Sequence, residues 1–206
     1  MLDQEISNIP AQGIESVVNR LVILQPTNFC NIDCQYCYLP DRNSYNLMQP
    51  QTLDKIAEVL FTSPFVSEKL RIVWHAGEPL TVPVSFYKDA VERFNGFNTN
   101  GIPISWGVQT NGTLINQDWC DFFKENGFDV GVSIDGPEEF HDRNRIDRKG
   151  RGTYKRVMEG VDLLRKNGIN WGILMVVDKD SAEVAELIWQ FFVENGMTSV
   201  GFNPEE

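Results

Sequence analysis

The sequence predicts an α/β protein built as a partial (β/α)6 TIM-like barrel of parallel strands. Apolar runs that fit strands alternate with segments of helical periodicity about five and a half times along the 206 residues. Such alternation is typical of a parallel sheet joined by right-handed helical crossovers. No glycine-rich dinucleotide fingerprint follows the first strand, so an open Rossmann sheet is less favoured than a partial barrel.

Six short apolar segments are the predicted strands. The first is a continuous Leu-Val-Ile-Leu run, which is typical of a strand buried on both faces of a sheet. The sixth begins only a few residues before the last residue of the sequence. The predicted strands are 21–24, 70–74, 102–108, 129–134, 169–177 and 199–202.

Helices are predicted between the strands from apolar residues at helical spacing and from local start and stop signals. Pro50 opens the first helix, Ser181 caps the last, and a glycine directly follows the end of each of the last three helices. The later helices are predicted at 83–94, 116 or 117 to 126, 153–167 and 181–195. We expect residues 1–18 to form an N-terminal arm, 19–206 to form one barrel domain, and 138–152 to be a long polar segment.

Composition and charge limit the classes of function. A length of 206 residues with 42% hydrophobic residues is enough for one domain with a core. The net charge of −11 argues against nucleic acid as a partner, because binding a polyanion needs a positive surface. No apolar run is long enough for a membrane span, and the N-terminus does not look like a signal peptide. Because three of the four cysteines are clustered, we expect a reducing, cytoplasmic location.

Chemically distinctive residues follow four of the predicted strands. Three cysteines follow the first strand, and the segments 75–79, 109–112 and 135–137 follow the second, third and fourth. Active sites of barrels are built at the carboxyl ends of their strands. Four such loops on one rim predict a single active site, and therefore an enzyme.

Cys30, Cys34 and Cys37 lie four and three residues apart and carry the strongest functional signal. A four-iron cluster normally takes four cysteines, so three of them leave one iron open to an outside ligand. Structural zinc sites usually have a second cysteine pair, which the sequence lacks, although zinc held by the three cysteines and His75 in a non-catalytic module is an alternative. A set of disulfides is a weaker alternative, because cysteines this close in sequence bridge poorly.

The stretch from Cys30 to Cys37 resembles the C-x3-C-x-aromatic-C signature of the radical S-adenosylmethionine (radical SAM) enzymes, with Tyr36 at the aromatic position. The resemblance implies that the three cysteines ligate a [4Fe-4S] cluster, whose open iron chelates the amino and carboxylate groups of S-adenosylmethionine (SAM). One electron would then cleave SAM to a 5′-deoxyadenosyl radical, which takes a hydrogen atom from the substrate. Tyr36 would lie along the adenine edge.

The segment Ala76-Gly77-Glu78-Pro79 resembles the family's G-G-E-P motif, with Ala76 in place of the first glycine. The resemblance implies that its backbone and glutamate hold the amino group of SAM. Unpaired carbonyls at a strand end suit an ammonium group, and a glycine lets the ligand approach the backbone closely. The neighbouring His75 is either a hydrogen-bonded structural residue or one that contacts substrate or handles a proton.

Other residues match family positions around SAM. Ser133 falls where a serine contacts the carboxylate or ribose, and Arg145 where an arginine binds the carboxylate, a pairing that guanidinium geometry favours. Asp135 either joins this set or caps a turn. Gln109 and Asn111 either contact cofactor or substrate or form the turn after the third strand.

Three further features have simpler interpretations beside any functional one. The basic interval 143–151 is either a solvated loop or part of the site. Cys120 lies within a predicted helix beside large aromatic residues and is expected to be a buried thiol. Tyr38 is either a core residue or one that faces adenine.

From residue 20 onward, the sequence resembles radical SAM maturases of ribosomally made peptides, including those that form cyclophanes by joining an aromatic ring to a side-chain β-carbon. It also resembles anaerobic sulfatase-maturing enzymes. Both groups carry a C-terminal SPASM-type domain with auxiliary iron–sulfur clusters. Because no cysteine follows Cys120, we expect this chain to be the barrel alone, with auxiliary clusters only in a domain that the chain lacks.

The resemblance predicts a radical enzyme that abstracts a β-hydrogen from a precursor peptide and crosslinks the carbon to an aromatic ring. Its expected partners are that peptide and an electron donor such as flavodoxin or ferredoxin. A formylglycine-generating sulfatase maturase is the rival enzyme, and a truncated, inactive barrel is a further alternative.

Overall fold

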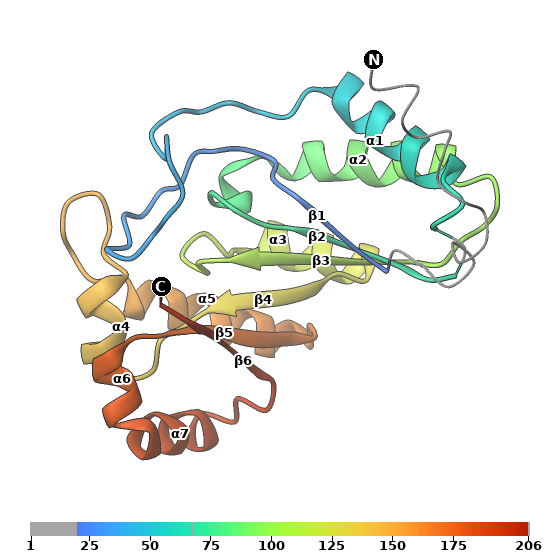
Figure 1. Cartoon of the computed structure of the whole chain (residues 1–206). Coiled ribbons are helices and arrows are strands. Elements are labelled where there is room, and N and C mark those ends of the chain that lie inside the picture. Colours follow the sequence, from blue (N-terminus) through green and yellow to red (C-terminus); the bar gives the residue numbers. More distant parts are fainter. Residues whose placement is uncertain (1–19, 67, 206) are drawn as a thin grey trace, which may run out of the picture.

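The computed structural model describes residues 20–66 and 68–205 and arranges them around one six-stranded sheet (Figure 1). All neighbouring strands are parallel, and their order in the sheet is their order in the chain. The strands are β1 (Leu21–Leu24), β2 (Leu70–Trp74), β3 (Ile104–Thr110), β4 (Asp129–Ser133), β5 (Trp171–Val177) and β6 (Val200–Pro204). The predicted α/β half-barrel of six parallel strands is therefore confirmed.

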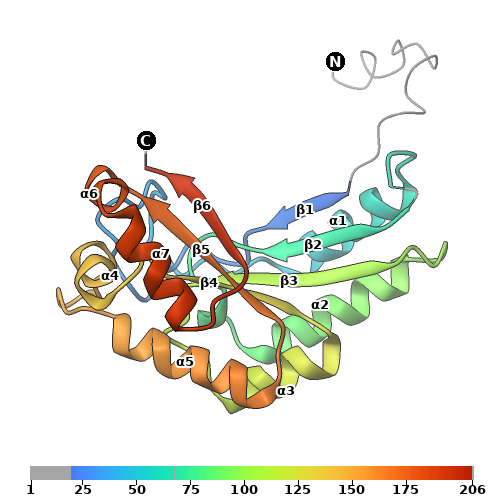
Figure 2. The same ribbon diagram turned by 90° about the horizontal axis from the view of Figure 1, so that it is seen from below.

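Helices connect successive strands and cover the outer side of the curved sheet (Figure 2). The helices are α1 (Pro50–Thr62), the short 3-10 turn η3 (Pro79–Thr81), α2 (Val84–Phe97), α3 (Gln117–Asn126), α4 (Glu138–Asn144), α5 (Tyr154–Asn167), α6 (Lys179–Glu183) and α7 (Ala185–Glu194). The loops that follow the strands gather at one end of the sheet, where β4 and α4 meet the segment after β1 (Figures 1 and 2).

The core lies between the outer face of the sheet and these helices. On β2, every second residue faces this layer, and Leu70, Ile72 and Trp74 are each fully buried. Trp74 meets Tyr87 of α2 edge-on, with ring centroids 5.2 Å apart, a favoured geometry for aromatic pairs. Alternation along the strands leaves the other side chains for the concave face, which becomes the wall of the site.

Two predictions about local structure were wrong, and one segment with no predicted element is partly helical. The polar segment 138–152 begins with α4, which has glutamates in its first turn and basic residues in its last, as the helix dipole favours. Contrary to the prediction, β1 is not buried on both faces, because Leu21 and Ile23 are 54% and 58% exposed. The predicted helix 181–195 is two helices, α6 and α7, which meet at Val184. Asp178, not Ser181, is the N-cap of α6, and the two side chains form a reciprocal capping box.

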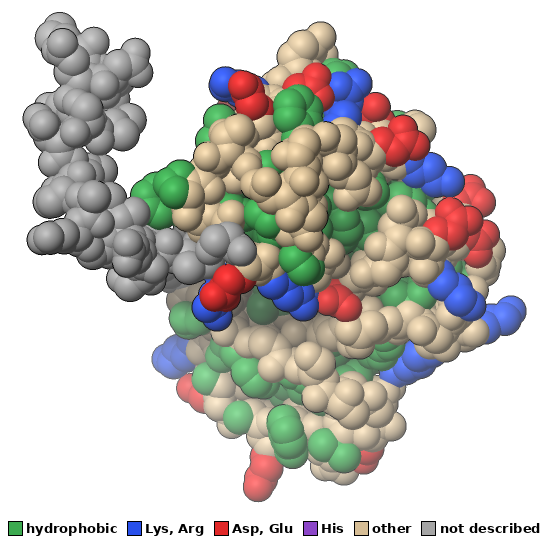
Figure 3. All heavy atoms as spheres, turned by 90° about the vertical axis from the view of Figure 1, so that its right-hand side faces the viewer, with side chains coloured by type: hydrophobic (Ala, Val, Ile, Leu, Met, Phe, Trp, Pro, Cys, Tyr) green, Lys and Arg blue, Asp and Glu red, His purple; other side chains and the backbone are tan. Residues whose placement is uncertain are grey.

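Three further predictions concern the N-terminal arm, membrane spans and surface charge. The predicted arm, residues 1–18, falls outside the described residues. Within the described part, no helix is long and apolar enough to cross a membrane. On the face in Figure 3, which looks toward the end where the strands begin, acidic and basic side chains are interspersed rather than gathered into a patch of one sign.

Candidate active site

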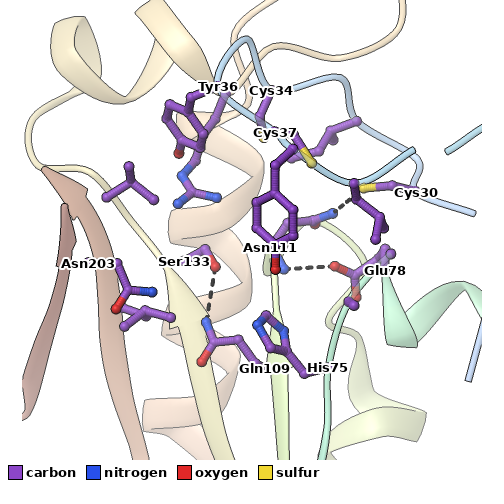
Figure 4. Close-up of a pocket in the computed structure, with 18 of the residues that line it drawn as sticks. Cys30, Cys34, Tyr36, Cys37, His75, Glu78, Gln109, Asn111, Ser133 and Asn203 are labelled. Atoms are coloured by element: carbon purple, nitrogen blue, oxygen red, sulfur yellow. Dashed lines mark hydrogen bonds between the residues drawn. The ribbon is translucent and has the colours of Figure 1, made fainter. Parts of the chain in front are cut away.

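A cavity of about 590 Å³ lies at the carboxyl end of the sheet (Figure 4). Its walls come from the loops after β1, β2 and β3 and from the ends of β4, β5 and β6. Most of the predicted site residues line it, namely Cys30, Cys34, Tyr36, Cys37, Ala76, Gly77, Glu78, Gln109, Asn111, Ser133 and Arg145. Pro79 and Asp135 do not line it.

The cysteine loop, residues 30–37, is held by its own backbone. The Cys30 N–H donates to the Arg42 carbonyl at 3.1 Å, which joins the first residue of the loop to the segment just after it. We call this contact between Cys30 and Arg42 the neck of the loop. The Asp33 N–H donates to the Ile146 carbonyl at 2.8 Å, and the Gln35 N–H donates to the carbonyl of Asn144 at 3.0 Å. The segment after α4 therefore runs beside the cysteine loop, although more than 100 residues separate them in sequence.

All four cysteines are free thiols, so the disulfide alternative finds no support. Burial raises the pKa of the Cys30 thiol to about 12 and that of Cys34 to about 11. Thiols in this state favour their protonated form, and a bound metal centre would reverse the preference by stabilising thiolates.

The residues fit a multi-iron cluster better than a single metal ion. Among the described residues, no group of three or more His, Cys, Asp or Glu side chains is placed to hold one ion. A four-iron cluster makes a different demand, because each cysteine binds its own iron. The three free cysteines on one short loop, all facing one cavity, meet that demand.

Glu78 is almost fully buried and joins the loops after β2 and β3. Its Oε1 accepts from the Thr110 hydroxyl at 2.6 Å and from the Leu80 N–H at 2.9 Å, and its Oε2 accepts from the Asn111 N–H at 2.7 Å. Burial raises the pKa of this carboxyl to about 7, although the three hydrogen bonds favour the charged form. The carboxylate therefore links the two loops through three accepted hydrogen bonds, and one acceptor position is left for a ligand.

The turn at Gly77 brings the end of β2 against the start of the cysteine loop. Ala76 and Gly77 both have positive φ, of 70° and 61°. A Cβ at Gly77 would lie 2.5 Å from the Thr27 carbonyl oxygen, so only glycine fits. The Glu78 N–H donates to the Phe29 carbonyl at 2.7 Å. The glycine of this motif is therefore required for the contact between two protein segments, independently of any ligand.

Asp135 and Arg145 form a buried ion pair at the cavity wall, in which Arg145 is the partner that lines the cavity. The Arg145 Nε and Nη2 donate to the two carboxylate oxygens of Asp135 at 2.8 and 3.0 Å. The Tyr36 hydroxyl donates to Asp135 Oδ2 at 2.5 Å, and the Arg145 guanidinium lies 5.4 Å from the Tyr36 ring centroid. Asp135 thereby fixes both the arginine and the tyrosine of the cysteine loop, which is more than the turn-capping role considered from sequence.

The loop after β3 contributes both turn-forming and cavity-facing groups. Asn111 accepts from the Thr113 N–H at 3.0 Å, as a turn residue does, while its Nδ2 donates to Asn31 Oδ1 at 2.8 Å and lies 3.9 Å from the Cys30 sulfur. Gln109 donates to the Ser133 hydroxyl at 3.0 Å (Figure 4). Asn111 therefore forms the turn, and both side chains line the cavity, while their contact with cofactor or substrate stays a prediction.

His75 lines the cavity beside Gln109 (Figure 4). Its ring has no hydrogen-bond partner among the described residues, so no protein contact supports the structural, hydrogen-bonded interpretation. Burial lowers the pKa of the imidazole, which favours the neutral form. Tyr38 is 89% exposed, so it is not a core residue, and Cys120 is the buried thiol that the sequence predicted.

Sequence patterns missed two groups of site residues. Leu174, Val176, Asn203 and Glu205 complete the cavity wall from β5 and from the segment at and just after β6. Leu174 and Gln109 also line a second cavity of about 380 Å³ at the beginning of the strands. The four missed residues from β5 and the β6 segment belong to no motif. Only the alternation of side chains along a recognised strand could have indicated that they face inward.

Comparison with known proteins agrees with this geometry. Residues 24–188 match the family model of the radical SAM superfamily. An uncharacterised protein of Synechocystis is 40% identical over 190 residues, which cover 90% of this chain and 48% of the relative. A serine-type anaerobic sulfatase-maturating enzyme of Bacteroides thetaiotaomicron is 37% identical over 190 residues, covering 89% of this chain and 45% of the relative.

A solved structure, native anSMEcpe with bound AdoMet and Cp18Cys peptide, superposes with a TM-score of 0.82 at 29% identity and covers 89% of this chain and 50% of that one. The chain thus spans about half the length of the curated relatives it matches. The matched family model covers the cysteine loop, the motif after β2 and the loop after β3, whose residues meet in one cavity. The chain belongs to the radical SAM superfamily.

Proposed function

We propose that this chain is the catalytic barrel of a radical SAM enzyme that modifies a side chain of a peptide or protein. The observation that carries the proposal is the meeting of three free cysteines, the Gly77-Glu78 turn and Arg145 around one cavity at the carboxyl end of the sheet. In a barrel this is where an active site belongs.

In this proposal, Cys30, Cys34 and Cys37 hold a [4Fe-4S] cluster, and SAM occupies the cavity beside it. Bound together, cluster and SAM would supply the 5′-deoxyadenosyl radical that removes a hydrogen atom from the substrate. The residues of this chain bind and orient. The end of β2 and Glu78 would receive the amino group of SAM, and Ser133 and Arg145 its carboxylate or ribose. Tyr36 would flank the adenine.

The primary reaction that we propose is an aromatic-to-Cβ crosslink in a ribosomally made peptide. The product has two hydrogens fewer than the substrate. One leaves as a hydrogen atom to 5′-deoxyadenosine, and the other leaves as a proton and an electron. The electron needs an acceptor, for which we propose an auxiliary iron–sulfur cluster in a further domain, and the first electron comes from a donor such as flavodoxin or ferredoxin. The similarity of the cysteine and Ala76–Pro79 motifs to cyclophane-forming maturases supports this substrate class.

Formylglycine formation on a sulfatase is the second candidate. It is favoured by the 37% identity to the serine-type sulfatase-maturating enzyme of Bacteroides thetaiotaomicron and by 31% identity to a cysteine-type enzyme of Clostridium novyi. Oxidation of a serine to an aldehyde also removes two hydrogens, whereas the same aldehyde made from a cysteine in addition replaces the sulfur by oxygen from water. For a serine target, mass alone therefore cannot separate this product from a crosslink.

The first test is cleavage of SAM by the chain after anaerobic reconstitution with iron and sulfide and reduction with dithionite. Wild type should release 5′-deoxyadenosine, and the Cys30, Cys34, Cys37 triple alanine variant should not. If wild type takes up iron and sulfide but leaves SAM intact, the chain is not a radical barrel of this kind.

The second test separates the two reactions. Candidate precursor peptides and sulfatase-type peptides are incubated with the reduced enzyme, and products lighter by two hydrogens are treated with an aldehyde-reactive hydrazide. A crosslinked peptide should stay unlabelled and should resist fragmentation inside the ring, whereas a formylglycine peptide should take up the label.

A further inference from the structure

The second part of the segment between α4 and α5 is a small hairpin, residues 146–152, which we call the arginine hairpin. An isolated bridge joins Ile146 to Gly152, and the Asp147 N–H donates to the Arg151 carbonyl at 2.7 Å. The Asp147 carboxylate accepts two backbone N–H groups of the hairpin and pairs with the Arg151 guanidinium at 2.7 Å. These bonds all lie within the hairpin, so its shape does not depend on any ligand in the cavity.

The arginine hairpin lies directly against the cysteine loop. Ile32 and Asp147 form an antiparallel bridge, and the Asp33 N–H donates to the Ile146 carbonyl at 2.8 Å. Ile32, in the middle of the cysteine loop, is 1% exposed. The basic interval that sequence could interpret as a solvated loop is therefore a support for the cysteines.

Arg148 reaches from the hairpin to the neck of the cysteine loop. Its Nε and Nη2 donate to the Cys30 carbonyl at 2.8 and 2.6 Å, and Nη2 also donates to the Arg42 carbonyl at 2.7 Å. Its Nη1 donates to the Asn43 side chain, and its guanidinium lies 5.3 Å from the Phe29 ring centroid. The planar guanidinium thus joins both sides of the loop's closure.

This arrangement is unusual for a surface arginine. The side chain is exposed, yet all three guanidinium nitrogens bind groups at the neck of the cysteine loop. Ordering so long a side chain costs conformational entropy, and a single surface pair stabilises a fold little. An effect on the loop, rather than on the stability of the whole fold, fits these contacts best.

We propose that Arg148 is a positioning residue for the metal cluster, and that it holds Cys30 in place for ligation by fixing the carbonyls of Cys30 and Arg42. The inference rests on the proposed function, because it requires the three cysteines to bind a cluster. Groups that orient metal ligands from outside the coordination sphere typically change metal affinity by 10- to 100-fold when they are removed.

The test compares R148Q with wild type and with R165Q as a matched control. Arg165 is also a surface arginine whose guanidinium donates to a backbone carbonyl, that of Asn195, and lies 5.2 Å from an aromatic centroid, that of Trp171. It sits on α5, away from the cysteine loop. Each protein is reconstituted anaerobically and then exposed to an iron chelator, and the loss of cluster absorbance and of bound iron and sulfide is followed in time.

R148Q should lose its cluster about tenfold faster than wild type, and R165Q should lose it at the wild-type rate. R148K should fall between them, because an ammonium can bond one carbonyl but cannot span two in the guanidinium plane. In the metal-free proteins, amide hydrogen exchange in the cysteine loop should be faster in R148Q alone, while the melting temperatures of R148Q and R165Q stay close to each other.

The inference is overturned if R148Q keeps its cluster as long as wild type does, or if R165Q loses it equally fast. A wild-type protein that takes up no cluster would instead overturn the proposed function, so the two failures are distinguishable.

Discussion

Glu78 shows how one side chain can hold a site together before any ligand arrives. Its carboxylate receives three donors from the segments that follow β2 and β3. In E78Q, one of the two oxygens becomes an NH2 group, which cannot accept a hydrogen bond. This group would face either the Asn111 N–H, or the Thr110 hydroxyl and the Leu80 N–H. A buried donor is then left unsatisfied, at a cost of about 1–3 kcal/mol.

We expect E78Q to lower the free energy of unfolding by that amount and to weaken SAM binding. Urea unfolding measures the first effect, and calorimetric titration of the reconstituted protein with SAM measures the second. The control is E68Q, at a glutamate whose side chain is 60% exposed, which should change neither quantity. Retained stability together with lost SAM binding would mean that the carboxylate acts on the ligand alone.

The Asp135–Arg145 pair is expected to be the most sensitive charge pair among the described residues. Its two side chains are 4% and 8% exposed, whereas those of the Arg143–Asp180 pair are 43% and 66% exposed. D135N leaves a buried guanidinium without its counter-charge, which typically costs about 3–5 kcal/mol. D180N should cost less than about 1 kcal/mol.

Urea unfolding of D135N and D180N at neutral pH checks this prediction. Equal destabilisation by the two variants would mean that the buried pair contributes no more to the free energy of unfolding than an exposed pair does.

Among the elements, α2 and α5 each contain a glycine that helix propensity alone would replace by alanine. A Cβ at Gly96 in α2 would meet no atom within 4 Å, whereas a Cβ at Gly160 in α5 would lie 2.6 Å from the Gly112 carbonyl oxygen. Gly112 follows β3, so the close approach of α5 to this turn fixes one wall of the site.

We expect G96A to stabilise the protein by about 0.5–1 kcal/mol, because alanine loses less backbone entropy in a helix. G160A should destabilise it by about 1–3 kcal/mol, because backbone atoms must move apart. Thermal and urea unfolding of the two variants gives the comparison. A stabilising G160A would show that α5 can shift away from the turn without penalty.

For the whole molecule, the stability at acid pH should depend on His141. This residue is fully buried; its Nε2 lies 3.0 Å from the Thr153 hydroxyl, and its Nδ1 faces the Asp135 N–H at 3.5 Å. Burial and then the nearby Arg145 charge lower the pKa of the imidazole to about 4, against the opposing effect of Asp135 and Asp142. The folded state therefore binds a proton less readily than the unfolded chain does.

A histidine with a lowered pKa contributes stability that is present above pH 6.5 and is lost as the pH falls toward 4. Glu78, with its raised pKa of about 7, acts in the opposite direction over part of this window. The difference in unfolding free energy between wild type and H141Q isolates the histidine, and it should shrink by about 2 kcal/mol from pH 7 to pH 4.5. A difference that is constant with pH, measured by urea unfolding of the metal-free proteins, would contradict the prediction.

The sequence by itself determined the architecture and the chemical core of the site. Continuous apolar runs and helical periodicity are local signals, and they located all six strands to within a few residues. The cysteine spacing and the motif 76–79 are also local, because neighbouring residues in a loop must act together. The rule that barrel loops meet at one rim then joined four separated segments into one site, since parallel strands place all their carboxyl ends on the same side.

The tertiary structure alone decided which atoms of these residues are already engaged and which remain for a ligand. Examples are the hydrogen bonds from Thr110 and Asn111 to Glu78, the pairing of Asp135 with Tyr36 and Arg145, and the hydrogen bond from Arg148 to Cys30. These contacts join residues that are far apart in the chain or that a loop without a recognisable pattern brings together. Such contacts leave no period in the sequence. They depend on the curvature of the sheet and on the detailed course of the loops, which are set by the packing of the whole barrel.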